Sequence, residues 1–73
     1  MTLAALKVGD KAQIVSFSDE IMSLKLLEMG CLPGEEVQLV RIAPAGDPIA
    51  IKVAGYMLSL RIDEASTINV VLK

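Results

Sequence analysis

The segment from residue 19 to residue 41 constrains the fold most, because it combines a helix, an abrupt stop and a turn into a strand. Asp19 is placed to cap the helix, since its carboxylate can accept a hydrogen bond from a free amide of the first turn. Apolar residues then recur with helical spacing, at Met22, Leu26 and Met29. Gly30 ends this pattern, because glycine adopts positive φ without steric cost and the nearby proline cannot continue a helix. We therefore predict one helix over residues 19–29.

The rest of the chain is predicted to form strands joined by turns. Alternating apolar and polar residues or runs rich in β-branched residues predict five strands, at 11–17, 35–41, 49–53, 56–62 and 67–72. The segment 43–48 holds two prolines and a glycine and is predicted as a loop, and the polar segment 63–66 fits one helical turn. Five strands in so short a chain are expected to close on themselves to hide their edges. The prediction is a mainly β fold with one inserted helix.

Size and composition indicate one small domain, residues 1–73, with apolar surface to spare. A chain of this length buries only about 60% of the surface that its unfolded form exposes. Apolar residues make up 53% of the sequence, more than one small core needs. Surplus apolar surface is typical of a protein that binds a partner, and it makes a homo-oligomer one of the alternatives.

Several function classes are disfavoured by the residues present. The net charge is −2, the lysines and arginines are dispersed, and the only aromatic residues are one Phe and one Tyr, so nucleic-acid binding is not expected. No histidine is present to activate Cys31, and no glycine-rich phosphate loop with a lysine occurs. We therefore expect no enzyme activity, no catalytic residue and no cofactor.

The cellular setting and metal binding follow from the same composition. A lone cysteine and the lack of a secretory signal after Met1 favour the cytoplasm, and no apolar run is long enough for direct membrane insertion. Three acidic pairs occur, at Asp19-Glu20, Glu35-Glu36 and Asp63-Glu64. Oxygen ligands suit hard cations, but acidic residues are also ordinary at a helix start and at turns. Without histidine, we expect no metal site within the chain.

Three segments in order resemble the ferrous iron transport protein A (FeoA) family. They are LAALKVGDKAQIV at the start, KLLEMGCLPGEEVQL in the middle and AGDPIAIKVAGYMLSLRIDEASTINV in the closing half, and together they cover nearly the whole chain. Lys25 and Cys31 depart from the residues that the family usually carries there. The resemblance implies a small SH3-like five-stranded barrel, which agrees with the strand count reached independently.

The resemblance also implies a function, which composition does not show. The family accompanies a membrane ferrous iron permease (FeoB), so the expected role is a non-enzymatic accessory protein that binds and modulates the permease's cytosolic G-protein domain. The alternative is a metal-responsive regulatory domain, because iron-dependent repressors carry the same barrel at their C-terminus. Phe17 and Tyr56 are expected in the barrel core and rim rather than in a proline-binding groove.

The helix supplies the predicted partner-binding residues. On a helical wheel, Leu24 and Leu27 lie opposite the stripe that would cover the barrel, although a short helix can also be buried on most sides. If one stripe is enough for the barrel, the other is free to bind a partner. The predicted partner-binding residues are Leu24, Leu27, Cys31 and Leu32, with Asp47 as a secondary contact. The alternative for Asp47 is a plain turn in which its carboxylate accepts backbone amides.

Overall fold

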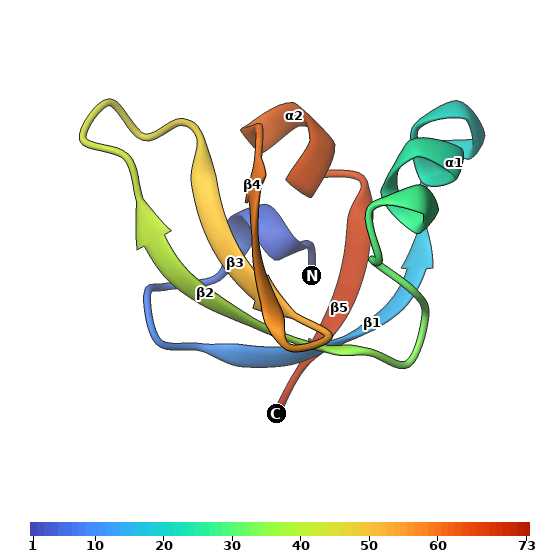
Figure 1. Cartoon of the computed structure of the whole chain (residues 1–73), viewed down its shortest axis with the longest axis horizontal. Coiled ribbons are helices and arrows are strands. Elements are labelled where there is room, and N and C mark those ends of the chain that lie inside the picture. Colours follow the sequence, from blue (N-terminus) through green and yellow to red (C-terminus); the bar gives the residue numbers. More distant parts are fainter.

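The computed structural model describes residues 1–73 as one curled antiparallel sheet with two helices (Figure 1). The elements in chain order are a 3₁₀ turn Leu3–Ala5, β1 Lys11–Phe17, α1 Glu20–Glu28, β2 Glu36–Ile42, β3 Ile49–Val53, β4 Tyr56–Leu60, α2 Ile62–Ala65 and β5 Ile68–Leu72. The strand order is β4-β3-β2-β1-β5, and every neighbouring pair is antiparallel. This confirms the predicted mainly β fold of five strands with one inserted helix.

The strand predicted at residues 56–62 ends two residues earlier in the structure. β4 ends at Leu60, and Ile62 is already the first residue of α2. The backbone amide of Arg61 donates to a Glu64 carboxylate oxygen at 2.9 Å, and the amide of Ile62 donates to Asp47 Oδ1 at 3.0 Å. Ile62 would be the next residue to bond to β3, but its amide is taken up by the Asp47 side chain, so the ladder with β3 stops and the chain turns into α2.

The barrel is open between β4 and β5, which both lie at the ends of the sheet order and do not pair with each other. α2 connects them across the opening (Figure 1). The register shifts between Ile14 and Ser16 and again between Leu39 and Arg41, and such bulges bend the strands. The expected closure is therefore achieved by curvature and by α2, and the ring of hydrogen bonds is incomplete.

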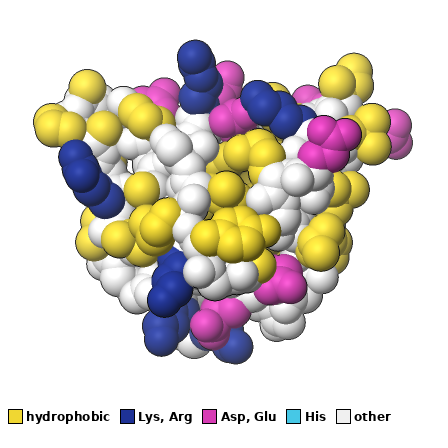
Figure 2. Space-filling model, in the orientation of Figure 1, with side chains coloured by type: hydrophobic (Ala, Val, Ile, Leu, Met, Phe, Trp, Pro, Cys, Tyr) yellow, Lys and Arg dark blue, Asp and Glu magenta, His cyan; other side chains and the backbone are white.

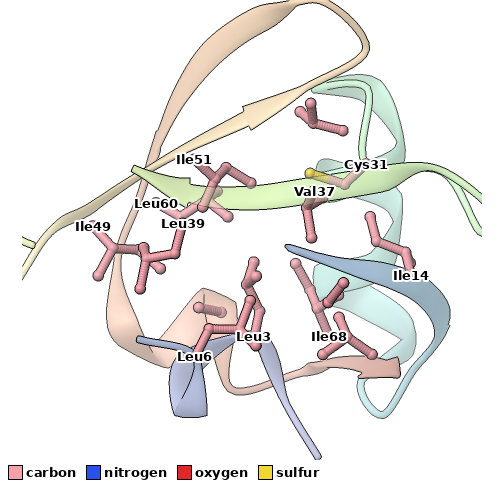
Figure 3. Close-up of a cluster of buried hydrophobic side chains, with 14 of the residues drawn as sticks. Leu3, Leu6, Ile14, Cys31, Val37, Leu39, Ile49, Ile51, Leu60 and Ile68 are labelled. Carbon is pink, nitrogen blue, oxygen red and sulfur yellow. The ribbon is translucent and has the colours of Figure 1, made fainter. Parts of the chain in front are cut away.

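The core lies inside the curled sheet (Figure 3). The alternation predicted for β1, β2 and β3 is observed, because their inward residues are buried and their outward residues are mostly exposed. α1 contributes Leu26, and the 3₁₀ turn contributes Leu3. The fifteen buried residues are Leu3, Leu6, Ala12, Ile14, Leu26, Cys31, Val37, Leu39, Ile49, Ile51, Val53, Leu60, Ala65, Ile68 and Val70.

Both ends of α1 are formed as the sequence predicts. Asp19 caps the start, with Oδ1 accepting the Met22 amide at 2.9 Å. At the other end the Cys31 amide donates to the Leu26 carbonyl at 2.9 Å, and the Gly30 amide donates to the Leu27 carbonyl at 3.1 Å. These two bonds define a Schellman motif, which requires the positive φ of +99° found at Gly30. The helix is therefore fixed by local sequence at both ends.

Gly30→Ala is expected to lower the free energy of unfolding by about 2 kcal/mol, of which positive φ accounts for roughly 1–2 kcal/mol. A Cβ at Gly30 would lie 2.9 Å from the Tyr56 hydroxyl oxygen, so the tyrosine must also move. Gly46→Ala is the matched control, because Gly46 has a φ of +92° and no atom within 4 Å of its Cβ position. Urea denaturation should show a larger loss of stability for Gly30→Ala, and equal losses would contradict the expected cost of moving Tyr56.

Candidate partner-binding surface

α1 has one face on the barrel and one face in solvent. Leu26 is fully buried, and Met22 and Met29 are half-buried against the core. On the other side Ile21 is 85% exposed and Leu24 is 65% exposed. The structure thus shows that one stripe is enough to hold the helix, and it excludes the alternative that α1 is buried on most sides.

Four exposed apolar side chains form what we call the α1 surface: Ile21, Leu24, Leu27 and Leu32. The first three follow one another at intervals of three residues, so they lie along one side of the helix. Leu27 is 36% exposed, and Leu32, in the turn after the helix, is 45% exposed. Figure 2 shows hydrophobic side chains at the end of the molecule that carries α1.

Cys31 does not belong to this surface, which corrects the prediction that placed it there. Its side chain is 0% exposed, and Figure 3 shows the sulfur atom among the core side chains. Burial, and then the negative charge of Glu64, raise the pKa of the Cys31 thiol, so the thiolate is disfavoured. The sequence could have indicated this burial. In a Schellman motif, the residue that follows the positive-φ glycine often packs against the last turn of the helix. Cys31 follows Gly30, and the matching residue of the last turn is Leu26.

Asp47 lies in the loop between β2 and β3, and this loop extends to the opposite end of the molecule from α1 (Figure 1). Its Oδ1 atom accepts the Ile62 amide at 3.0 Å, so the carboxylate joins this loop to the start of α2. Asp47, Pro48 and Arg61 line a shallow cleft of about 240 Å³. Asp47 therefore has a structural role in holding this loop to α2, and it does not lie with the residues of the α1 surface.

Lys25 and Glu64 form a contact that sequence reasoning missed. The Lys25 ammonium nitrogen lies 2.7 Å from Glu64 Oε2, and Glu64 Oε1 accepts the Arg61 amide. The ion pair joins α1 to α2, and Glu64 is the one buried charged residue. The hydrogen bond from Lys25 and then the Arg61 amide hold the pKa of Glu64 below its ordinary value of 4.5. A glutamate at the third position of a short helix was the only local signal.

Glu64→Gln is expected to lower the free energy of unfolding by on the order of 1 kcal/mol at pH 7, discounted for the exposure of Lys25. Because folding depresses the pKa of Glu64, its stabilising effect is present above pH 4.5 and is lost as the pH falls through the folded-state pKa. Urea denaturation at several pH values should show the two proteins converging below pH 4.5. A constant difference would contradict this account, and Glu28→Gln controls for the loss of one charge.

The three acidic pairs lie apart and have separate roles. Asp19 caps α1, Glu64 binds Lys25, and Glu36 lies 3.0 Å from the Lys73 ammonium nitrogen. No group of three or more His, Cys, Asp or Glu side chains is arranged to hold a metal ion. Neither helix has the length and apolar character to cross a bilayer.

Comparison with known proteins decides the family. Residues 1–72 match the family model described as FeoA domain. This chain belongs to the FeoA family. A curated FeoA relative, the Fe(2+) transport protein A/Fe(2+) transporter FeoB fusion protein of Porphyromonas gingivalis, is 36% identical over 73 residues. The match covers 99% of this chain but only 9% of that relative, so most of the fusion protein has no counterpart here.

Solved FeoA structures share the fold. The FeoA-like protein from Clostridium acetobutylicum matches with a TM-score of 0.94 and 34% identity, covering 99% of this chain and 85% of that chain. Stenotrophomonas maltophilia FeoA, solved with zinc and described as an SH3 domain protein, matches with a TM-score of 0.84 and 33% identity over 97% of this chain and 89% of that one. The predicted SH3-like barrel and the predicted FeoA family are both confirmed.

A manganese-dependent transcriptional repressor shares the same architecture. Its TM-score is 0.89, but the identity is 19%, over 99% of this chain and 36% of that chain. At this identity the similarity shows a common FeoA-like fold and nothing about function.

Proposed function

We propose that this chain is a cytoplasmic accessory protein of ferrous iron transport that binds and modulates the cytosolic G-protein domain of a ferrous iron permease. The observation that carries the proposal is the Porphyromonas gingivalis relative, in which Fe(2+) transport protein A and the Fe(2+) transporter FeoB are one polypeptide. Two proteins that are fused in one species act at close range. We therefore expect the separate chains to bind each other.

The chemistry of the chain supports a role without catalysis. The sequence contains no histidine, and the single thiol is buried with a raised pKa, so it is a poor nucleophile. The alternative role as a metal-responsive regulatory domain rests on fold similarity alone, and we do not propose it.

Within this proposal, the α1 surface is the partner contact, with Leu24, Leu27 and Leu32 as the named residues. These side chains are exposed although the same helix already buries Leu26 in the core. An apolar helix face that the fold does not need is typical of an interaction site. Asp47 stays a secondary candidate, since its second carboxylate oxygen has no hydrogen bond in the structure.

Titration calorimetry with the purified G-protein domain of the permease from the same organism tests the proposal. The titration is run without nucleotide, with GDP and with a non-hydrolysable GTP analogue. We expect saturable binding in at least one nucleotide state. A dissociation constant weaker than about 1 mM in all three states, which corresponds to roughly −4 kcal/mol, would contradict the proposed function.

A further inference from the structure

The outer edge of β4 is the one sheet edge with which no other segment of the chain pairs. The other edge, on β5, is covered by the N-terminus, because the Val70 amide donates to the Met1 carbonyl at 2.9 Å and Thr2 bridges Asn69. β4 pairs with β3 alone, and its second side faces the opening of the barrel (Figure 1). The backbone groups on that side are available to another chain.

The hairpin register identifies those groups. β3 and β4 are joined by Ala54 and Gly55, whose φ angles of 51° and 89° are both positive, as a type I′ turn requires. Val53 pairs with Tyr56, and the residues that flank a two-residue hairpin turn exchange both hydrogen bonds. Alternation then directs the backbone groups of Leu58 towards β3 as well.

Met57 and Ser59 therefore direct their amides and carbonyls away from β3. Outside the regular strand pairs, no backbone or side-chain hydrogen bond of the structure uses these four groups. Two donors and two acceptors, two residues apart, are the pattern that an added strand pairs with.

The side chains of β4 do not protect this edge. Tyr56–Leu60 contains no charged residue and no proline, which are the usual devices that keep a strand from pairing with another chain. Tyr56 and Met57 are exposed and Leu58 is half-buried, so an apolar strip runs beside the free backbone groups. Figure 2 shows hydrophobic side chains on the face that carries β4.

We propose that an extended segment of the partner protein adds to β4 as a sixth strand. The Tyr56 side chain reaches the backbone of Gly30, and α2 begins two residues after β4 ends. These two features leave little room beside β4, which suits a single added strand better than the whole sheet edge of a second copy.

The charges nearby indicate the chemistry of the added segment. Arg61 follows β4 directly, is exposed and has no ion pair. Two carboxylates lie near it and both already have partners: Asp47 accepts the Ile62 amide, and Glu64 accepts the Arg61 amide and pairs with Lys25. The segment is therefore expected to be uncharged where it lies along β4 and to carry a carboxylate at the end that reaches Arg61.

Amide hydrogen exchange tests the pairing directly. The identity of the partner rests on the proposed function, so the probe is the purified, unlabelled G-protein domain of the permease at saturating concentration. The Met57 and Ser59 amides should exchange at least about tenfold more slowly in the complex, while Leu58, already bonded to β3, changes less. Unchanged exchange at Met57 and Ser59 in the saturated complex would overturn strand addition.

A pair of substitutions separates this inference from the proposed function. Ser59→Pro removes an outward amide at an edge position, and Ser59→Thr keeps it. We expect Ser59→Pro to weaken binding about tenfold and Ser59→Thr to change it less than about twofold. If wild type binds and both variants bind equally, strand addition is wrong and the proposed function stands. If the wild-type protein does not bind, strand addition and the proposed function are both wrong. Should Ser59→Pro not fold by circular dichroism, the exchange of the wild-type complex decides.

Discussion

Leu26→Ala is expected to lower the free energy of unfolding by about 3 kcal/mol, the largest effect that we predict for a single side chain of α1. Leu26 is the only fully buried residue of that helix. Its removal leaves a cavity at the place where α1 packs on the barrel. A domain of this size has a total stability of roughly 4–11 kcal/mol, so the variant should unfold at a much lower urea concentration.

Leu24→Ala is the matched control, because it removes the same atoms from the same helix. Leu24 is exposed, and a surface substitution of this kind changes the free energy of unfolding by less than about 0.5 kcal/mol. If the two variants lose a similar amount of unfolding free energy, α1 does not pack with Leu26 towards the barrel and Leu24 towards solvent.

Leu24→Glu is expected to weaken binding to the G-protein domain at least tenfold, about 1.4 kcal/mol, while leaving the fold intact. A carboxylate placed in a desolvated apolar contact loses its hydration without gaining a partner. Calorimetry under the conditions of the wild-type titration measures the change. Circular dichroism and urea denaturation report whether the variant is folded.

Val40→Glu controls for the added charge. Val40 is an exposed apolar residue of β2, away from α1, so the same substitution there should leave binding within about twofold of wild type. Equal weakening by both variants would indicate a general effect of charge. Unchanged binding of a folded Leu24→Glu protein would remove the α1 surface from the proposal.

The parts of the fold that follow from local sequence are predicted correctly. The cap at Asp19, the stop at Gly30 and the alternation in Ile49–Val53 each depend on residues within a few positions of one another. The exposed face of α1 follows from helical spacing once the buried stripe is known. These features need no information about distant segments.

The parts that depend on distant segments are not predicted. Lys25 and Glu64 meet only because α1 and α2 are brought together by the barrel. The contact of Tyr56 with Gly30 likewise joins β4 to the end of α1. The early end of β4 depends on Asp47, from another loop, taking the Ile62 amide. Local patterns contain no signal for such pairings.

A map of the partner contact on this chain tests most directly whether the α1 surface binds the G-protein domain. Spectra of the ¹⁵N-labelled protein would be recorded while the unlabelled G-protein domain is added. On the side of the molecule that carries α1, we predict that the amide signals of Leu24, Leu27 and Leu32 shift or broaden most. Binding that leaves these three amides unchanged and instead perturbs only the outer face of the sheet would contradict a partner contact at the α1 surface.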